Sequence, residues 1–116
     1  MKEPFGIDCG DPSAAGNDRV FMDGSTRSFT VLRTAVVGYG TYRPGWKWSL
    51  HAKPQVGKES ERHIGYFVSG AMMVKGSSGN LVQIDSGCAF EIGPGSDAWV
   101  LGNEPCIAMD FTPIGE

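Results

Sequence analysis

The sequence predicts an all-β domain, either a barrel or a sandwich of short strands. Short runs rich in β-branched and aromatic residues recur along the chain, and glycine or proline separates them. The 17 glycines and 7 prolines are spread along the chain instead of forming one linker. No apolar period of 3.6 residues continues for three turns, so no long helix is expected.

Composition limits the function classes. A chain of 116 residues has room for one domain with its own core. The net charge of −3 and the scattered basic residues argue against nucleic acid as a partner. No apolar run approaches the roughly 18 residues of a membrane span, and residues 1–13 lack an apolar signal core. We therefore expect a soluble protein of the cytoplasm that does not associate with a membrane.

The first half of the chain begins with an arm at residues 1–18, where Gly, Pro and Asn predict loose structure. The barrel domain is expected over residues 19–116. Its first strands are expected at Arg19–Met22, at Ser28–Val37 (rich in Val, Thr and Phe), at Trp46–Ala52 after a Pro-Gly turn, and at the aromatic run His63–Ser69.

The second half repeats short strands between turns. A hairpin loop is expected at Gly76–Asn80, where glycine and asparagine permit positive φ. The flanking strands are Ala71–Lys75 and Leu81–Ile84, and the later ones are Cys88–Ile92 before Gly93-Pro94-Gly95, Ala98–Leu101 before Gly102-Asn103, and Cys106–Phe111.

The run His63–Ser69 has two distinct faces. Side chains alternate along a strand, so His63, Gly65 and Phe67 share one face, which we expect to point inward. The opposite face, with Ile64 and its alternate neighbours, is also apolar. We expect the N-terminal arm or a partner chain to cover it.

Two segments resemble the paired motifs of the cupin superfamily. The first is residues 44–53 continuing to residues 63–70, and the second is residues 87–99 with its Gly-Pro-Gly turn. The resemblance implies a single jelly-roll (cupin-like) β-barrel with a small-molecule pocket at its mouth. In metal-binding cupins, two histidines, a glutamate and a final histidine hold one divalent cation.

Only part of that ligand set is present. By resemblance, His51 matches the first histidine, Lys53 occupies the second, His63 stands in place of the glutamate and Ser96 in place of the last histidine. His51 and His63 could share Zn, Fe, Ni, Mn or Cu. The missing third donor would come from a nearby acid or amide (Gln55, Glu59, Glu61 or Asp97). Alternatively, both histidines are satisfied without metal.

The charge of Lys53 affects which ligand the expected pocket would bind. With His51 two residues before it on a strand, its ammonium would point into the pocket, oppose a cation and favour an anionic ligand. A bulge after Leu50 would instead turn it to solvent.

Aromatic residues are concentrated near these motifs. They could line a pocket for a ring, a sugar or an apolar ligand, or pack in the core and at a dimer seam. We expect a homodimer, with an aromatic outer patch covered by the partner. The outer patch is expected at Trp46, Trp48 and Trp99, and the aromatic concentration as a whole also includes Tyr66 and Phe67.

Cysteine usage fits a reducing compartment. The three cysteines lack metal-knuckle spacing. Cys88 and Cys106 lie in apolar stretches and are expected to be buried and slow to react, whereas Cys9 on the arm is expected to react quickly.

The predicted function is small-molecule binding in a pocket around His51 and His63, in a sensor or accessory role. Lys53, Phe67 and Ser96 are the other expected ligand contacts. The alternative is a metal-dependent cupin enzyme of the dioxygenase, isomerase or lyase type.

Overall fold

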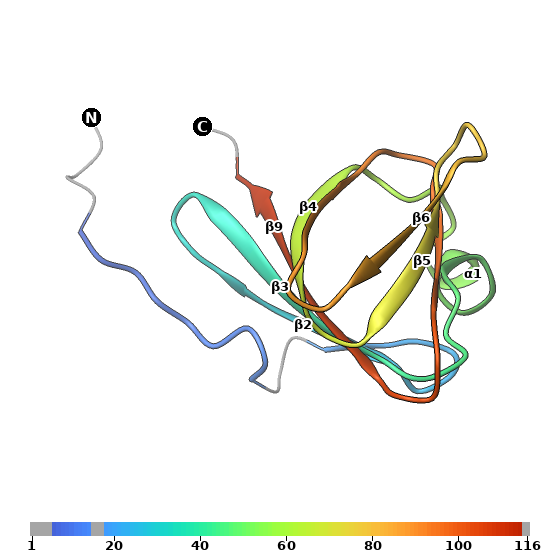
Figure 1. The fold of residues 1–116 in the computed structure, drawn as a ribbon. Helices are drawn as coiled ribbons and strands as arrows, with labels where there is room; N and C mark the ends of the chain where they lie inside the picture. The colour runs from blue at the N-terminus through green and yellow to red at the C-terminus, as the bar shows by residue number, and fades with distance from the viewer. Residues whose placement is uncertain (1–5, 15–17, 115–116) are drawn as a thin grey trace.

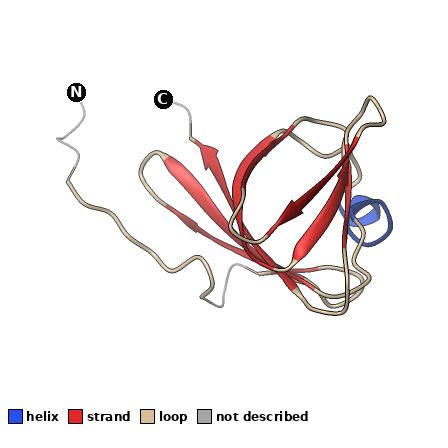
Figure 2. Ribbon diagram, viewed as in Figure 1, coloured by secondary structure: helices blue, strands red, loops and turns tan. Residues whose placement is uncertain are grey.

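The computed structural model describes residues 6–14 and 18–114, which form a β-barrel preceded by an exposed arm (Figures 1 and 2). Two short helical turns interrupt the strands between β3 and β4. The elements are β1 (Arg19–Val20), β2 (Thr26–Val31), β3 (Ala35–Tyr42), the π-helical turn η1 (Trp48–Ala52), α1 (Lys53–Val56), β4 (His63–Ser69), β5 (Ala71–Lys75), β6 (Leu81–Asp85), β7 (Ala89–Ile92), β8 (Asp97–Val100) and β9 (Cys106–Pro113).

The strands form two antiparallel sheets. One sheet has six strands in the order β1-β2-β3-β9-β4-β7, and the other has three in the order β6-β5-β8. The last strand, β9, lies between β3 and β4, so the C-terminal strand joins the two halves of the large sheet (Figure 1). The all-β class expected from the sequence is confirmed.

The core lies between the two sheets. Its buried members are Phe21, Trp46, Ala52, Phe67, Met72, Val100, Cys106 and Ala108. They come from strands and loops that are distant in sequence, so this shared apolar interior holds the sheets together. Trp46 belongs to this core, and it is therefore not part of the aromatic outer patch on which we based the expected dimer.

Several expected elements are confirmed. β4 and β5 have the expected bounds. The loop before β6 is closed by Gly76 N donating to the Asn80 carbonyl at 2.9 Å, and Gly79 has a φ of +94°. On β4, His63, Gly65 and Phe67 face inward and the alternate residues face outward, as expected.

The single strand expected at Ser28–Val37 is wrong, because the chain reverses within it. β2 ends at Val31, β3 begins at Ala35, and Leu32 N donates to the Ala35 carbonyl at 2.8 Å. The turn contains no glycine, proline or asparagine, so it lacks the usual turn residues.

The strand expected at Trp46–Ala52 is also wrong. The backbone N–H of His51 donates to the Lys47 carbonyl at 2.9 Å, which closes a helical turn. The Asp97 carboxylate accepts from both Ser49 N (3.0 Å) and Ser49 Oγ (2.8 Å). A carboxylate from the second motif therefore satisfies a donor that a strand would have used in a sheet.

Of the two cysteines expected to be buried, Cys106 is buried, but Cys88 is exposed, so the expected burial of Cys88 is wrong. Among the described residues, no helix has the length and apolar character needed to cross a membrane.

Candidate functional site

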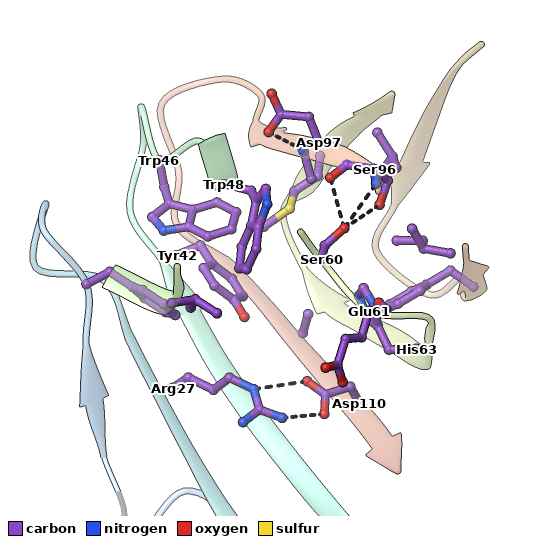
Figure 3. A pocket seen from close by; sticks show the side chains of 18 of the residues that line it. Arg27, Tyr42, Trp46, Trp48, Ser60, Glu61, His63, Ser96, Asp97 and Asp110 are labelled. Carbon is purple, nitrogen blue, oxygen red and sulfur yellow. Dashed lines mark hydrogen bonds and ion pairs between the residues drawn. The ribbon is translucent and has the colours of Figure 1, made fainter. Parts of the chain in front are cut away.

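A cavity of about 700 Å³ opens between the two sheets (Figure 3). Aromatic side chains form much of its wall, and paired polar side chains lie among them. The aromatic members are Phe21, Phe29, Tyr42, Trp46, Trp48, Phe67 and Phe90. Ligand pockets of small molecules have this size and mixture.

Glycines on the inner face of β3 make room for the polar floor of the cavity. A Cβ at Gly38 would lie 2.3 Å from Arg27 Nη2 and 2.6 Å from Asp110 Oδ1. A Cβ at Gly40 would lie 2.4 Å from the Tyr42 ring. The Arg27–Asp110 pair therefore lies directly over Gly38, and the ring of Tyr42 lies over Gly40.

Arg27 on β2 and Asp110 on β9 form a bidentate ion pair across β3 (Figure 3). Arg27 Nη2 lies 2.6 Å from Asp110 Oδ1, and Arg27 Nε lies 3.3 Å from Oδ2. Burial alone would lower the pKa of Arg27, but the hydrogen bond and the charge of Asp110 outweigh it and raise that pKa. The guanidinium thus stays charged and held in one orientation.

Tyr42 connects this floor to the aromatic wall. Its ring centroid lies 4.5 Å from that of Trp46 and 6.1 Å from that of Phe21. Burial raises the pKa of the Tyr42 hydroxyl, and Asp110 adds to this while Arg27 opposes it. The hydroxyl is therefore neutral at physiological pH and able to donate a hydrogen bond.

The wall also contains polar atoms without partners. The indole Nε1 atoms of Trp46 and Trp48 are buried and make no hydrogen bond within the described part of the chain. An unpaired buried donor costs about 1–3 kcal/mol. The end of the cavity that the two tryptophans form therefore contains N–H donors without acceptors behind its aromatic rings.

The segment before β4 is fastened to the turn after β7. Ser60 Oγ donates to the Ser96 carbonyl at 3.0 Å and accepts from Ser96 N at 3.0 Å. Gly95 N donates to the Ser60 carbonyl at 2.9 Å. The Gly-Pro-Gly turn of the second motif therefore positions one rim of the cavity.

The residues expected at the site divide into two groups. His63, Phe67 and Ser96 line the cavity, whereas His51 and Lys53 are absent from its lining. His51 Nδ1 accepts from Lys47 N at 3.0 Å, and Lys53 Nζ lies 2.7 Å from Glu59 Oε2. The helical turn, which replaces the expected strand, removes the two-residue alternation that would have aimed both side chains inward.

The described residues do not fit the metal centre that the cupin resemblance implies. His63 Nδ1 is engaged with the Glu61 carbonyl at 3.0 Å, and His51 lies outside the cavity lining. Within residues 6–14 and 18–114, no cluster of three His, Cys, Asp or Glu side chains could hold an ion. A stable transition-metal site needs at least three such ligands.

Sequence reasoning missed Arg27, Tyr42 and Asp110. The available signal was the Gly-x-Gly-x-Tyr pattern of residues 38–42, since alternate glycines on one strand face indicate close approach of other groups. Which side chains fill that space depends on the pairing of β2, β3 and β9.

No protein-family model matches the chain, and no curated protein matches it. Solved structures do share its fold. KdgF from Halomonas sp. superposes with a TM-score of 0.61 at 18% identity, over 87% of this chain and 89% of its own. A Klebsiella pneumoniae protein with a double-stranded β-helix domain gives a TM-score of 0.57 at 18% identity, over 89% of this chain and 77% of its own.

The cupin domain of Cnp3 from Schizosaccharomyces pombe also has this architecture. Its TM-score is 0.57 at 9% identity, over 79% of this chain and 61% of its own. The chain therefore has the cupin fold, the double-stranded β-helix, as the sequence motifs indicated.

Proposed function

We propose that this cupin domain binds a small, neutral molecule that carries a ring and neighbouring hydroxyl groups. It acts as a ligand-binding module in a sensor or accessory role. The observation that carries the proposal is the cavity of about 700 Å³, with tryptophans at one end, Tyr42 in the middle and the Arg27–Asp110 pair at the other end (Figure 3).

The shape of the wall supports a ring. Trp48, Tyr42 and Phe67 offer flat apolar surfaces, and such surfaces pack well against the face of a sugar or an aromatic ring. Phe67 and Phe90 meet edge to face with ring centroids 5.1 Å apart, so this part of the wall is already packed.

The balance of charge supports a neutral ligand. Most charged side chains of the lining have partners of opposite sign. Lys53, whose charge suggested an anion, lies outside the lining. The pairs are Arg27 with Asp110, Lys47 with Asp97, Lys53 with Glu59, Lys58 with Glu61 and Arg62 with Glu91. Bringing an unpaired charge into this cavity would cost free energy.

The polar floor supports hydroxyl recognition. A guanidinium has five N–H donors, and Asp110 accepts from Nε and Nη2 only. A carboxylate oxygen accepts more than one hydrogen bond. The pair can therefore donate to one ligand oxygen through Arg27 and accept from a neighbouring hydroxyl through Asp110.

Quenching of tryptophan fluorescence by catechol tests the proposal, because Trp46 and Trp48 form part of the wall. Catechol is expected to bind at least about tenfold more tightly than its dimethyl ether, which cannot donate, and than benzoate, which is charged. Asp110→Asn should reduce that preference, whereas Arg62→Met, which breaks an exposed pair, should leave it unchanged. Equal binding of catechol and its ether, or tighter binding of benzoate, would contradict the proposal.

The alternative of a metal-dependent enzyme has no comparable support, because the donor set described above supplies too few ligands.

A further inference from the structure

Residues 58–62 form one wall of the cavity. Along β2, β5 and β9 only alternate residues line the cavity, because successive side chains of a strand point to opposite faces. Residues 58–62 line it without a break. They belong to no helix or strand, since α1 ends at Val56 and β4 begins at His63. This wall is therefore not held by the hydrogen bonding of either sheet.

The segment is attached to the barrel through Ser60 (Figure 3). Ser60 Oγ donates to the Ser96 carbonyl at 3.0 Å and accepts from Ser96 N at 3.0 Å, and Gly95 N donates to the Ser60 carbonyl at 2.9 Å. Among the described residues, no other backbone–backbone hydrogen bond joins residues 58–62 to the barrel. We call these three hydrogen bonds between Ser60, Gly95 and Ser96 the latch.

The ion pairs of the segment are exposed. Glu59 pairs with Lys53 on α1, and Arg62 pairs with Glu91 on β7, through side chains that are between 41% and 66% exposed. A third pair joins two residues of the segment itself. Water screens exposed pairs, so they add little to the attachment. The latch is therefore the main contact that holds this wall in place.

Gly57 provides a hinge at the start of the segment. Its φ is +81°, and a Cβ at this position would meet nothing within 4 Å. Glycine changes its backbone angles more freely than other residues, and no neighbouring atom restricts Gly57. The segment can therefore turn about this residue once the latch is broken.

We propose that residues 58–62 are a gate, which opens at the latch to admit a ligand and closes over it. This inference rests on the proposed function and adds the control of ligand entry to it. A ligand in the cavity contacts residues of the gate, so its binding favours the closed state. Association is slowed, because the gate must open first.

Amide hydrogen exchange of the full chain, measured by NMR without ligand, tests the latch. Ser60→Ala removes both hydrogen bonds of the hydroxyl but keeps the one from Gly95 N to the carbonyl of residue 60. Exchange of the Gly95 amide should become at least about tenfold faster, because the gate opens more often. The Phe67 amide on β4, which donates to the Cys88 carbonyl, should keep its rate.

Ser78→Ala is the matched control for this variant. It removes a serine hydroxyl that donates to Asn80 in an exposed hairpin loop, and it should leave the Gly95 rate unchanged. An unchanged Gly95 rate in Ser60→Ala would contradict the latch. So would an equal rise at Gly95 and Phe67, because that result indicates a loss of global stability instead of opening of the gate.

A pair of cysteines tests whether the gate controls entry. Ser60 Oγ and Ser96 Oγ lie 3.3 Å apart, so Ser60→Cys combined with Ser96→Cys can form a disulfide that holds the gate closed. Catechol should then quench tryptophan fluorescence in stopped flow at least about tenfold more slowly than after reduction of the same protein. Each single-cysteine variant should give one rate under both conditions. Equal rates for the oxidised and reduced double variant would refute the gate.

Failure of the gate and failure of the proposed function give different results. If catechol does not bind the unmodified chain, the proposed function is contradicted, while the exchange rate of Gly95 still decides whether the latch opens. If catechol binds with the expected preferences but enters the oxidised double variant as fast as the reduced one, the cavity is the binding site and the gate is wrong.

Discussion

Breaking the Arg27–Asp110 pair should destabilise the fold in a way that an exposed pair does not. Asp110→Asn keeps the shape of the side chain but leaves the guanidinium of Arg27 without its counter-charge. The side chains of Asp110 and Arg27 are 15% and 32% exposed. Loss of one partner from a fully buried pair costs about 3–5 kcal/mol, and the partial exposure of Arg27 reduces the expected cost to about 2 kcal/mol.

The expected loss can be measured by urea unfolding, followed by the fluorescence of Trp46 and Trp48. In thermal unfolding, the same cost of about 2 kcal/mol corresponds to a fall in Tm of about 8 °C for a domain of this size. The cycle of Arg27→Met, Asp110→Asn and the double variant should give a coupling energy of about 1–2 kcal/mol. Once both partners are replaced, no uncompensated charge remains, so the double variant should be more stable than Asp110→Asn alone.

The control is the Arg62–Glu91 pair, whose side chains are 66% and 56% exposed and whose N···O distance is 3.0 Å. Arg62→Met should cost less than about 0.5 kcal/mol, because water screens an exposed pair. A coupling energy below about 0.5 kcal/mol for Arg27 and Asp110, or equal costs for the two pairs, would refute the inference that the cavity floor is a structural ion pair.

Three further outcomes are expected. Gly65→Ala should cost at least about 2 kcal/mol in urea unfolding, because its Cβ would lie 2.2 Å from the Met109 carbonyl oxygen, whereas Gly93→Ala, with nothing within 4 Å, should be nearly neutral. Burial raises the pKa of Cys106 from 9.0 to about 12, so the unfolded chain loses this proton at a lower pH than the folded chain. The free energy of unfolding should therefore fall as the pH rises through that range. A Cys106→Ala variant whose free energy of unfolding falls equally steeply with pH would contradict this cause. Added Zn²⁺ should leave Tm unchanged, because the described residues offer too few ligands to hold an ion. An ion bound by the folded state alone would stabilise it by about 2.7 kcal/mol at a hundredfold excess over its Kd. A saturable rise in Tm would therefore contradict this expectation.

The strands of the second half could be predicted because each one ends at a strong turn signal. Glycines and prolines at residues 76–80, 93–95 and 102–105 separate runs that have no helical period. The inward face of β4 could also be predicted, because successive side chains of a strand point to opposite faces of the sheet, here the barrel interior and the exterior.

The conformation of residues 46–56 could not be predicted in the same way. Its aromatic and apolar residues resemble a strand, but tertiary contacts decide its structure. Asp97, distant in sequence, accepts two hydrogen bonds from Ser49, and Ala52 is buried in the core. Since His51 and Lys53 lie in this segment, the expected strand also led to the expectation that both side chains point into the cavity, whose lining does not include them.

Glycines at inward-facing strand positions explain both why the barrel has a cavity and why polar side chains lie on its floor. Large side chains facing inward from β3 and β4 would have filled the barrel and stabilised it by burial. The chain instead has Gly38, Gly40 and Gly65 at those inward positions, with an ion pair, Tyr42 and Phe90 lying over them. Glycine in a strand costs about 0.5–1 kcal/mol relative to alanine, and a buried ion pair adds little net stability. These positions weaken the fold while they create an ordered polar floor, and this combination supports the proposed binding role.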